Sequence, residues 1–174
     1  GRSVIDATLV PWLSSRGLNG VDVLVVSHLD AHHAGGAARA MAVLNPSVLL
    51  TAMDPRLLGM DDSVEGRFQP CLAGSTLPWA DGAIEVLQPQ QMAHTTEDAR
   101  QDQNSCVIRV RSSAGSVLLA GDLPAQAEAA LVKAQGDRLP ADVLVVPQEG
   151  GRQGTGKHLL AAVRPALAVV QTTH

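Results

Sequence analysis

The chain of 174 residues has few aromatic side chains and no excess of positive charge. It contains one Phe and two Trp, and its 13 Lys and Arg are outnumbered by 17 Asp and Glu, which gives a formal net charge of −4. Proteins that hold nucleic acid through side chains alone use basic stripes or aromatic platforms for base stacking. The composition argues against tight, non-specific binding of that kind. It allows a phosphodiester site in which divalent cations supply the positive charge.

Long apolar runs and closely spaced cysteines are also absent. The longest apolar runs, residues 21–26 and 166–170, are far shorter than the roughly 20 residues of a membrane-spanning helix, so we expect the chain itself to be soluble. We see no basic leader with a cleavage site and expect no export signal within the chain. Cys71 and Cys106 lie too far apart for a CxxC zinc or redox motif. We expect two buried thiols, with a disulfide only if the chain folds in an oxidising compartment.

Segments of strand type and of helix type alternate along the chain, and the length suits one domain, residues 1–174, with its own core. Strands are predicted over residues 21–26, 47–52, 83–89, 106–111, 116–121, 141–147 and 166–170, and helices over 7–16, 37–44, 125–134 and 157–163. The strands in the middle are separated by short turns and are expected to pair antiparallel. The Gln-rich segment 88–103 is expected to be a mobile surface loop and a candidate lid. This order of elements predicts an α/β fold.

Four strands that look buried end in polar residues. These ends are Ser27-His28, Asp122, Gln148-Glu149 and residues 171–174. In layered α/β folds ligands bind at the carboxyl ends of strands, because the loops there are free of packing duty while the strands hold them rigidly. We therefore expect these side chains to converge if the four ends share one edge.

The sharpest local feature is the sequence His28-Leu29-Asp30-Ala31-His32-His33, which sets four potential metal ligands within a short loop. Imidazole nitrogen and carboxylate oxygen suit Zn, Mn or Fe equally well, so the ligand types do not choose the metal. The alternative is a polar helix entry in which Ser27 or Asp30 is the N-cap. The Gly-Gly pair that follows the loop and the second acid at Asp122 favour a metal site, although Asp122 could also be the N-cap of its own helix.

Five segments together resemble the metallo-β-lactamase-type domain of ComEC-type competence proteins. In order along the chain they are SHLDAHHAGG (27–36), LPWADGAIEVLQP (77–89), NSCVIRV (104–110), LLAGD (118–122) and ADVLVVPQEGG (141–151). The resemblance implies a metallo-β-lactamase-like αββα sandwich. The opening strands of that family, with their Asp-x-Gly motif, have no counterpart here, so we expect the sandwich to be incomplete at its N-terminus.

Carried over by position, the resemblance assigns metal ligands and supporting residues. The implied ligands of a divalent ion, Mn or Zn, are His28, Asp30, His33 and Asp122. His32 stands where the family has Asp, and Asp30 and His32 are the implied catalytic pair. The residues expected to support the ligands or to contact substrate are Asn104, Ser105, Gln148 and Glu149.

The chain departs from the family at several of these positions. Gln148 and Glu149 stand where the family loop has two His, Gly151 replaces Ser, and only the terminal His174 offers a match for a late His. An amide is a poor ligand compared with imidazole, and His32 removes a negative charge that would offset the cation. We therefore expect metal affinity to be weakened.

The resemblance implies a nuclease-like domain that hydrolyses the DNA strand not transported during uptake. Its implied partners are single-stranded DNA and a transmembrane channel part of the same protein, with no small-molecule cofactor. Its implied location is an extramembrane domain at a bacterial membrane, on the periplasmic or extracellular side rather than in the cytoplasm. The alternative is a degenerate, inactive domain that packs against the channel or guides DNA, favoured by Gln148. A lactonase or thioesterase is supported by fold analogy alone.

Overall fold

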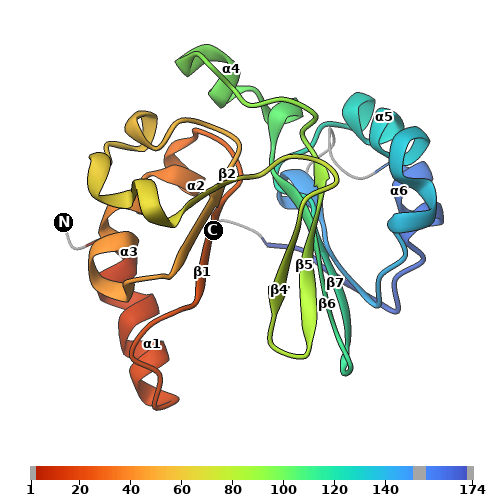
Figure 1. Cartoon of the computed structure of the whole chain (residues 1–174). Helices are drawn as coiled ribbons and strands as arrows, with labels where there is room; N and C mark the ends of the chain where they lie inside the picture. Colours follow the sequence, from red (N-terminus) through yellow and green to blue (C-terminus); the bar gives the residue numbers. More distant parts are fainter. Residues whose placement is uncertain (1–2, 151–155, 172–174) are drawn as a thin grey trace.

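The computed structural model describes residues 3–150 and 156–171 (Figure 1). Its first half contains a three-stranded parallel sheet, in the order β1 (Val23–Val26), β2 (Val48–Thr51) and β3 (Phe68–Pro70). The helices around it are η1 (Ile5–Leu9), α1 (Val10–Ser15), α2 (Ala31–Ala34), α3 (Ala37–Leu44), η2 (Pro55–Leu58) and η3 (Asp62–Arg67). Within the described part of the chain, β1 pairs only with β2 and so forms an edge of this sheet.

The second half contains a six-stranded mixed sheet. Its strands, in order across the sheet, are β4 (Thr76–Trp79), β5 (Gly82–Gln88), β6 (Val107–Ser112), β7 (Gly115–Leu119), β8 (Val143–Val145) and β9 (Leu167–Val169). Strands β4 to β7 are antiparallel, as expected for the middle of the chain, and β7, β8 and β9 are parallel. The helices of this half are α4 (Thr96–Arg100), η4 (Asp102–Asn104), α5 (Ala125–Gln135), η5 (Gly136–Arg138), η6 (Pro147–Gly150) and α6 (Lys157–Val163).

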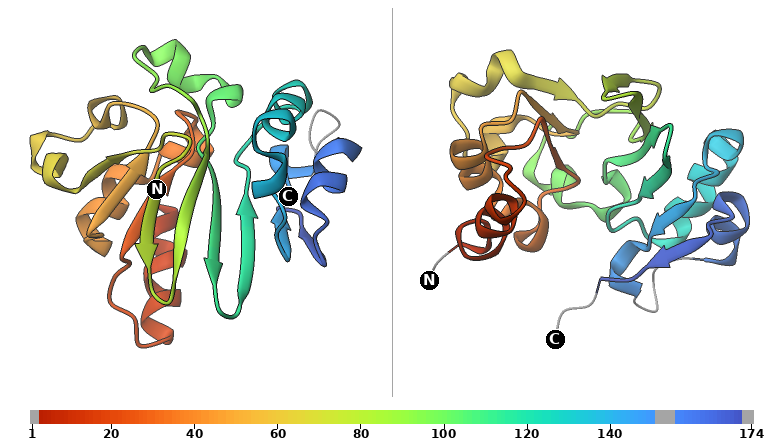
Figure 2. Two further views of the ribbon diagram at one scale, coloured as in Figure 1. Left: turned by 45° about the vertical axis from the view of Figure 1, so that its right-hand side comes forward. Right: turned by 90° about the horizontal axis from the view of Figure 1, so that it is seen from below.

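The two sheets face each other, and helices cover their outer faces (Figures 1 and 2). Leu50 of β2 belongs to the same buried cluster as Ile84 of β5 and Ile108 of β6, which places this cluster between the sheets. Because side chains alternate along a strand, the neighbouring Leu49 points to the other side and packs with residues of α3. Leu118 of β7 likewise packs with α5 and α6. The layers therefore run helix, sheet, sheet, helix.

Helix α3 shows how the local sequence produces these layers. Ala37, Ala40, Met41 and Leu44 recur at helical spacing and are all buried. The helix ends where Asn45 takes a left-handed conformation with φ of 45°, before a proline that cannot continue it. The prediction of a helix over residues 37–44 is confirmed with the same bounds.

The expectation of two buried thiols is wrong, because Cys71 and Cys106 form a disulfide. Cys71 follows β3 of one sheet and Cys106 precedes β6 of the other, and both are buried in the cluster between the sheets. Their Cα atoms are 5.9 Å apart although 35 positions separate them in sequence. The bond therefore links the two sheets. Closing a loop of this length stabilises the fold by about 3–4 kcal/mol in the chain-entropy model.

Two other predictions about elements need correction. The Gln-rich segment 88–103 is not a plain loop, since it contains α4 and most of η4, and its Ala93 and Ala99 are buried. The last strand looked buried from its apolar composition, but Leu167 and Val169 of β9 are 57% and 38% exposed. Strand β9 lies at the edge of the six-stranded sheet, so its apolar side chains have fewer neighbours to cover them.

None of the helices described here has both the length and the apolar character that crossing a membrane requires.

Candidate metal centre

The polar ends of several strands meet at one edge of the two sheets, where α2 and α4 also lie (Figure 1). His28 follows β1, Asp122 follows β7, and Gln148 lies in η6 directly after β8. The expected convergence of these ends is therefore seen for the first three. Of the fourth end, Gln171 lines a cavity together with His33 and Asp122, and residues 172–174 lie outside the described part of the chain.

His28 is the buried centre of this group, with only 1% of its surface exposed. Its Nδ1 lies 3.1 Å from Oγ of Ser27 and 3.5 Å from Oγ of the buried Ser105. These hydroxyls orient the ring so that Nε2 faces two carboxylates, 3.7 Å from Oδ1 of Asp102 and 3.9 Å from Oδ2 of Asp122. Supporting hydrogen bonds of this kind fix the ring of a metal-binding histidine and leave the opposite nitrogen free to bind the ion.

Asp30 and His33 approach His28 from the single turn of α2. Asp30 is the N-cap of this turn, and its Oδ1 accepts a hydrogen bond of 2.7 Å from the backbone N–H of His32. The same oxygen lies 3.8 Å from Nδ1 of His33, and the His28 and His33 rings have centroids 4.4 Å apart. One ligand atom from each of His28, Asp30 and His33 lies within 4.8 Å of the others. The capping and metal-ligand interpretations of Asp30 are thus compatible.

The protonation states suit metal binding. Burial lowers the pKa of His28, and the charge of His33 lowers it further, while Asp122, Asp102 and Asp30 raise it in part. The net effect favours the neutral imidazole, which is the form that binds a metal. The pKa of Asp30 is also lowered, chiefly by the backbone hydrogen bond from His32, which favours its charged carboxylate.

Asp122 lies beside both histidines. Its Oδ1 lies 3.5 Å from Nε2 of His33, and its Oδ2 faces His28 as described above. The alternative that Asp122 caps the following helix does not hold, because the N-cap of α5 is Pro124, with no side-chain hydrogen bond. Asp122 is 23% exposed, so the carboxylate lies at the wall of the group and remains accessible.

Gly121 allows the end of β7 to reach the histidine loop. Its φ is +57°, a left-handed backbone conformation that residues other than glycine rarely adopt. A Cβ atom at this position would lie 3.0 Å from Cβ of Ser105 and 3.2 Å from Cβ of Ser27. These are the two serines that orient His28, so a larger residue at position 121 would displace them and disturb the orientation of the His28 ring.

Asp102 is a member of the group that the sequence did not reveal. It lies in η4, inside the segment predicted as a loop, and its Oδ2 accepts a hydrogen bond of 2.8 Å from Nε2 of Gln148. The same Nε2 also donates to the backbone carbonyl of Asp122 at 2.6 Å. Asp102 looked like any other acidic residue of a polar segment, such as Glu97 or Asp98, and no local signal distinguishes it.

The remaining predicted residues lie around the group or beyond what is described. The amide of Asn104 donates to the backbone carbonyl of Asp98, so it stabilises the turn between α4 and η4. His32 is exposed on α2, and its backbone binds Asp30. Glu149 lies in η6 and its side chain is outside the description, as are residue 151 and the C-terminal histidine.

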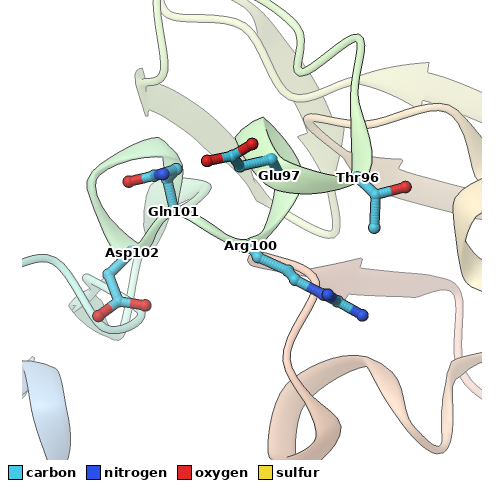
Figure 3. A pocket seen from close by; sticks show the side chains of 5 residues that line it. All are labelled: Thr96, Glu97, Arg100, Gln101 and Asp102. Atoms are coloured by element: carbon cyan, nitrogen blue, oxygen red, sulfur yellow. The ribbon is translucent and has the colours of Figure 1, made fainter.

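Two cavities flank α4 beside this group. One, of about 520 Å³, is lined by Thr96, Glu97, Arg100, Gln101 and Asp102 (Figure 3). The other, of about 640 Å³, is lined by Leu29, Asp30, Ala31, Ala34, Gly35, Leu57, Leu58, Thr96 and Arg100. Figure 3 shows the side chains of Arg100 and Asp102 diverging from the same side of this segment. Arg100 borders both cavities, so each has a positive charge in its lining as well as a carboxylate of the group.

The donor atoms fit a divalent transition-metal ion. Two ligands that each lie about 2.0–2.2 Å from one ion are about 3–4.4 Å apart, depending on the angle between them. Three histidine–carboxylate pairs that use Nε2, those of His28 with Asp102 and Asp122 and that of His33 with Asp122, are separated by 3.5 to 3.9 Å, which lies in this range. The pair of His33 and Asp30, at 3.8 Å, uses Nδ1, and one ion can take only one of the two nitrogens of this ring. The buried Nδ1 of His33 has no hydrogen-bond partner. The group therefore offers imidazole and carboxylate donors that hydrogen bonds within the protein do not use up.

Comparison with known proteins relates the chain to bacterial proteins named for recombination and competence. It is 30% identical over 172 residues to Recombination protein 2 of Haemophilus influenzae, which covers 99% of this chain and 20% of that protein. It is 29% identical over 165 residues to Competence protein ComA of Neisseria gonorrhoeae, with coverage of 94% and 22%. ComE operon protein 3 of Bacillus subtilis is 23% identical over 175 residues, with coverage of 97% and 22%.

These similarities indicate a relationship to competence proteins. The chain spans about a fifth of the length of these relatives. No family model matches the chain. The similarity extends over nearly the whole of this chain, so it includes the loop of His28 and both carboxylates that face it.

Proposed function

We propose that this chain is a metal-dependent hydrolase domain of the metallo-β-lactamase type, which cuts the DNA strand that is not transported during DNA uptake. The observation that carries the proposal is the group of His28, Asp30 and His33, with Asp122 beside both imidazoles. The similarity to proteins named for competence supports a role in DNA uptake. The succession of helix, sheet, sheet and helix layers supports the choice of fold.

His28, Asp30, His33 and Asp122 would hold a divalent ion, Mn²⁺ or Zn²⁺. When bound, such an ion supplies the positive charge that binds a scissile phosphate and lowers the pKa of a water molecule toward about 7. Ser27 and Ser105 keep the ring of His28 in one orientation. Because His28 is buried and neutral, it contributes a nitrogen donor without adding charge.

His32 is proposed to carry a proton between the leaving group and solvent. It is exposed on α2, and its backbone is tied to the carboxylate of Asp30 at the edge of the ligand group. An imidazole with access to water is suited to this task because one ring nitrogen can accept a proton while the other donates one. In this scheme Asp30 has two tasks, holding the ion and fixing the turn that presents His32.

The cavities on both sides of α4 are the proposed path of the DNA backbone. Arg100 borders both, and its guanidinium makes no hydrogen bond or ion pair with another described side chain. A free guanidinium binds a phosphate through two parallel hydrogen bonds. The residues that line these two cavities include no aromatic side chain, which suits a single strand held by its backbone and not by base stacking.

The disulfide supports a location outside the cytoplasm. Cys71 and Cys106 join the two sheets, and structural disulfides persist in oxidising compartments. We therefore place the domain on the periplasmic or extracellular side of a bacterial membrane. Its proposed partner there is the membrane-embedded part of a longer protein, since the relatives extend far beyond the matched segment.

A second candidate function is a non-catalytic domain that keeps the fold and guides DNA or packs against the channel. Gln148 favours it, because its amide nitrogen donates hydrogen bonds at the edge of the group and has no lone pair for a metal. This candidate predicts the same binding partners but no hydrolysis.

One assay separates the two. The purified chain is incubated with Mn²⁺ or Zn²⁺ and labelled single- and double-stranded DNA, beside a His28→Ala variant and a His94→Ala control. His94 is exposed and lines a cavity that contains no member of the group, so it controls for loss of an imidazole. Metal-dependent cleavage by the parent and the control, absent in His28→Ala, supports the hydrolase. No cleavage by the parent leaves the non-catalytic domain.

A further inference from the structure

Asp102 stands out because it faces the same imidazole nitrogen as Asp122. Its Oδ1 lies 3.7 Å from Nε2 of His28, and Oδ2 of Asp122 lies 3.9 Å from the same atom. Both distances exceed a hydrogen bond, and among the described residues this nitrogen has no hydrogen-bond partner. The Nε2 of the buried residue His28 therefore faces two carboxylates without a hydrogen bond to either. A cation shared by all three groups would satisfy this arrangement.

Gln148 is oriented to hold Asp102 in place. Its amide contacts two oxygens, Oδ2 of Asp102 at 2.8 Å and the carbonyl of Asp122 at 2.6 Å. Both of these are acceptors, so the NH₂ end of the amide must face them. The amide nitrogen consequently cannot bind a metal. It instead ties η4 to the end of β7, which brings the Asp102 carboxylate beside the Asp122 carboxylate.

The backbone at Gln148 is adapted to this contact. Its φ is 53°, in the left-handed region, which costs free energy in residues other than glycine and persists only where the surroundings enforce it. The two hydrogen bonds of the side chain stabilise this conformation. A residue without the amide would lose this stabilisation, and Asp102 would lose the hydrogen bond that holds its carboxylate.

We propose that Asp102 is a ligand of the metal ion, taking the role that Gln148 cannot fill, and that Gln148 is the residue that positions it. This inference rests on the proposed metal site. Asp102 is 45% exposed, so its Oδ1 is accessible to an ion and the Oδ2 held by Gln148 limits its rotation. The added carboxylate also restores a negative charge to the cation's surroundings.

The choice of metal follows from the donor types. With Asp102 the group has three carboxylates and two imidazoles. Mn²⁺ prefers carboxylate oxygen, whereas imidazole nitrogen suits Zn²⁺. Removing this carboxylate should therefore weaken Mn²⁺ binding more than Zn²⁺ binding. The ratio of the two affinities is a readout that does not depend on hydrolysis.

The test is calorimetric titration of the whole chain with MnCl₂ and with ZnCl₂. Asp102→Asn keeps the size of the side chain and removes the charge, and we expect Mn²⁺ affinity to fall at least tenfold. Glu97→Gln is the matched control, because Glu97 lines the same cavity and loses the same charge without facing His28. We expect its affinity to change less than twofold. Circular dichroism of the metal-free variants checks that each is folded.

A second variant tests the positioning role. Gln148→Asn keeps an amide and tolerates the left-handed backbone, but it is one methylene too short to reach Asp102. We expect a loss of Mn²⁺ affinity close to that of Asp102→Asn, and no additional loss when both changes are combined, because both remove the same ligand. The visible absorption spectrum of bound Co²⁺ should change in Asp102→Asn and stay unchanged in Glu97→Gln.

The results separate the inference from the proposed function. If the parent binds Mn²⁺ and Asp102→Asn binds it as tightly as Glu97→Gln does, Asp102 is not a ligand, and the site of the four other ligands stands. If Mn²⁺ does not bind the parent at all, the inference is overturned together with the metal site. Binding that depends on Asp102, without hydrolysis of DNA, supports the inference and contradicts the hydrolase.

Discussion

Two groups of charged side chains in this protein are arranged in opposite ways. On the six-stranded sheet, Glu85 of β5 is paired with Arg109 and Arg111 of β6, with N–O distances of 2.6 and 3.0 Å. At the edge of the sheets, Asp102 and Asp122 face His28 at 3.7 and 3.9 Å. In the first group every charged side chain has a partner of opposite charge within the protein, so the group needs no ligand to hold it together. The second gathers two carboxylates around the imidazole of His28, an arrangement that a cation would stabilise.

The comparison indicates where each group acts. Arg109 also donates to the carbonyl of Pro140, so the Glu85 group ties the strands to the loop before β8. It contributes to the stability of the fold. The group around His28 has been assembled from segments on both sheets and contributes nothing comparable by itself. We expect substitutions in the first group to change unfolding and substitutions in the second to change metal binding.

The largest effect on stability is expected from Glu85→Ala. The change leaves the guanidinium of Arg109, which is 14% exposed, without its carboxylate. Removing one partner of a largely buried pair costs about 3–5 kcal/mol. Denaturant unfolding monitored by circular dichroism measures this, with exposed Glu97→Ala as the charge-matched control. A loss below about 1 kcal/mol would break the comparison, since it would mean that the pair is not structural.

Asp122→Asn should have its main effect on metal binding. Asp122 lies within 3.9 Å of both imidazoles, so its replacement removes a carboxylate ligand from the site that His28 and His33 form. We expect Mn²⁺ affinity to fall about a hundredfold, which is a loss of about 2.7 kcal/mol in binding free energy. This is the upper end of the range seen when a residue that supports a metal ligand is replaced. Without metal, the free energy of unfolding should be unchanged or slightly higher, because the variant removes the repulsion between the carboxylates at positions 102 and 122. Calorimetric titration and metal-free denaturation measure the two halves of this prediction.

Gly121→Ala should lower both stability and metal affinity, since it strains the backbone and crowds the two serines that contact the ring of His28. The new Cβ would lie 3.0 to 3.2 Å from the Cβ atoms of Ser105 and Ser27, at a φ of +57°. We expect a loss of about 1–3 kcal/mol in unfolding free energy, together with weaker Mn²⁺ binding. Gly59→Ala is the control, because Gly59 also has a positive φ of 71° but no atom within 4 Å of the added Cβ. Equal losses in the two variants would show that crowding has no part in the effect.

The stability that Glu85 contributes should depend on pH. Burial raises the pKa of Glu85, but hydrogen bonds and charges from Arg109 and Arg111 outweigh this effect, and the net pKa is lowered. The native state then binds fewer protons than the unfolded state, so stability rises with pH. The contribution is present above the unfolded pKa of about 4.3 and is lost as the pH falls below it. Denaturation midpoints between pH 3 and 7 should vary less in Glu85→Gln than in the parent. Parallel curves would contradict the assignment.

The smallest effect is expected from Arg100→Ala. If Arg100 contacts one DNA phosphate, affinity for a single-stranded oligonucleotide should fall a few-fold, and the dependence on salt concentration should weaken by roughly one charge. Fluorescence anisotropy at several salt concentrations measures both. Lys133→Ala, an exposed cation of α5, is the matched control. An unchanged salt dependence in Arg100→Ala would exclude the cavities beside α4 as the path of the backbone.

Much of the fold could be predicted from short stretches of sequence. The helix over residues 37–44 and the strand over 47–52 follow from local periodicity and from the Asn-Pro pair between them. The partners of Cys71 and Asp102 could not be predicted in this way. Cys71 bonds to a residue 35 positions away, and Asp102 is held by one 46 positions away. Neither partnership leaves a periodic trace in the sequence.

The sequence by itself determined seven of the nine described strands, the helices over 37–44, 125–134 and 157–163, and the histidine-rich turn after β1, because apolar spacing and turn residues act over a few positions. It did not reveal β3, β4 or α4. Only the tertiary structure decided that the cysteines are bonded, that Asp102 joins the group around His28, and that the amide of Gln148 donates to Asp102. These contacts depend on how the two sheets pack face to face. That packing sums many weak apolar contacts between distant segments, so it brings together side chains that no local pattern connects.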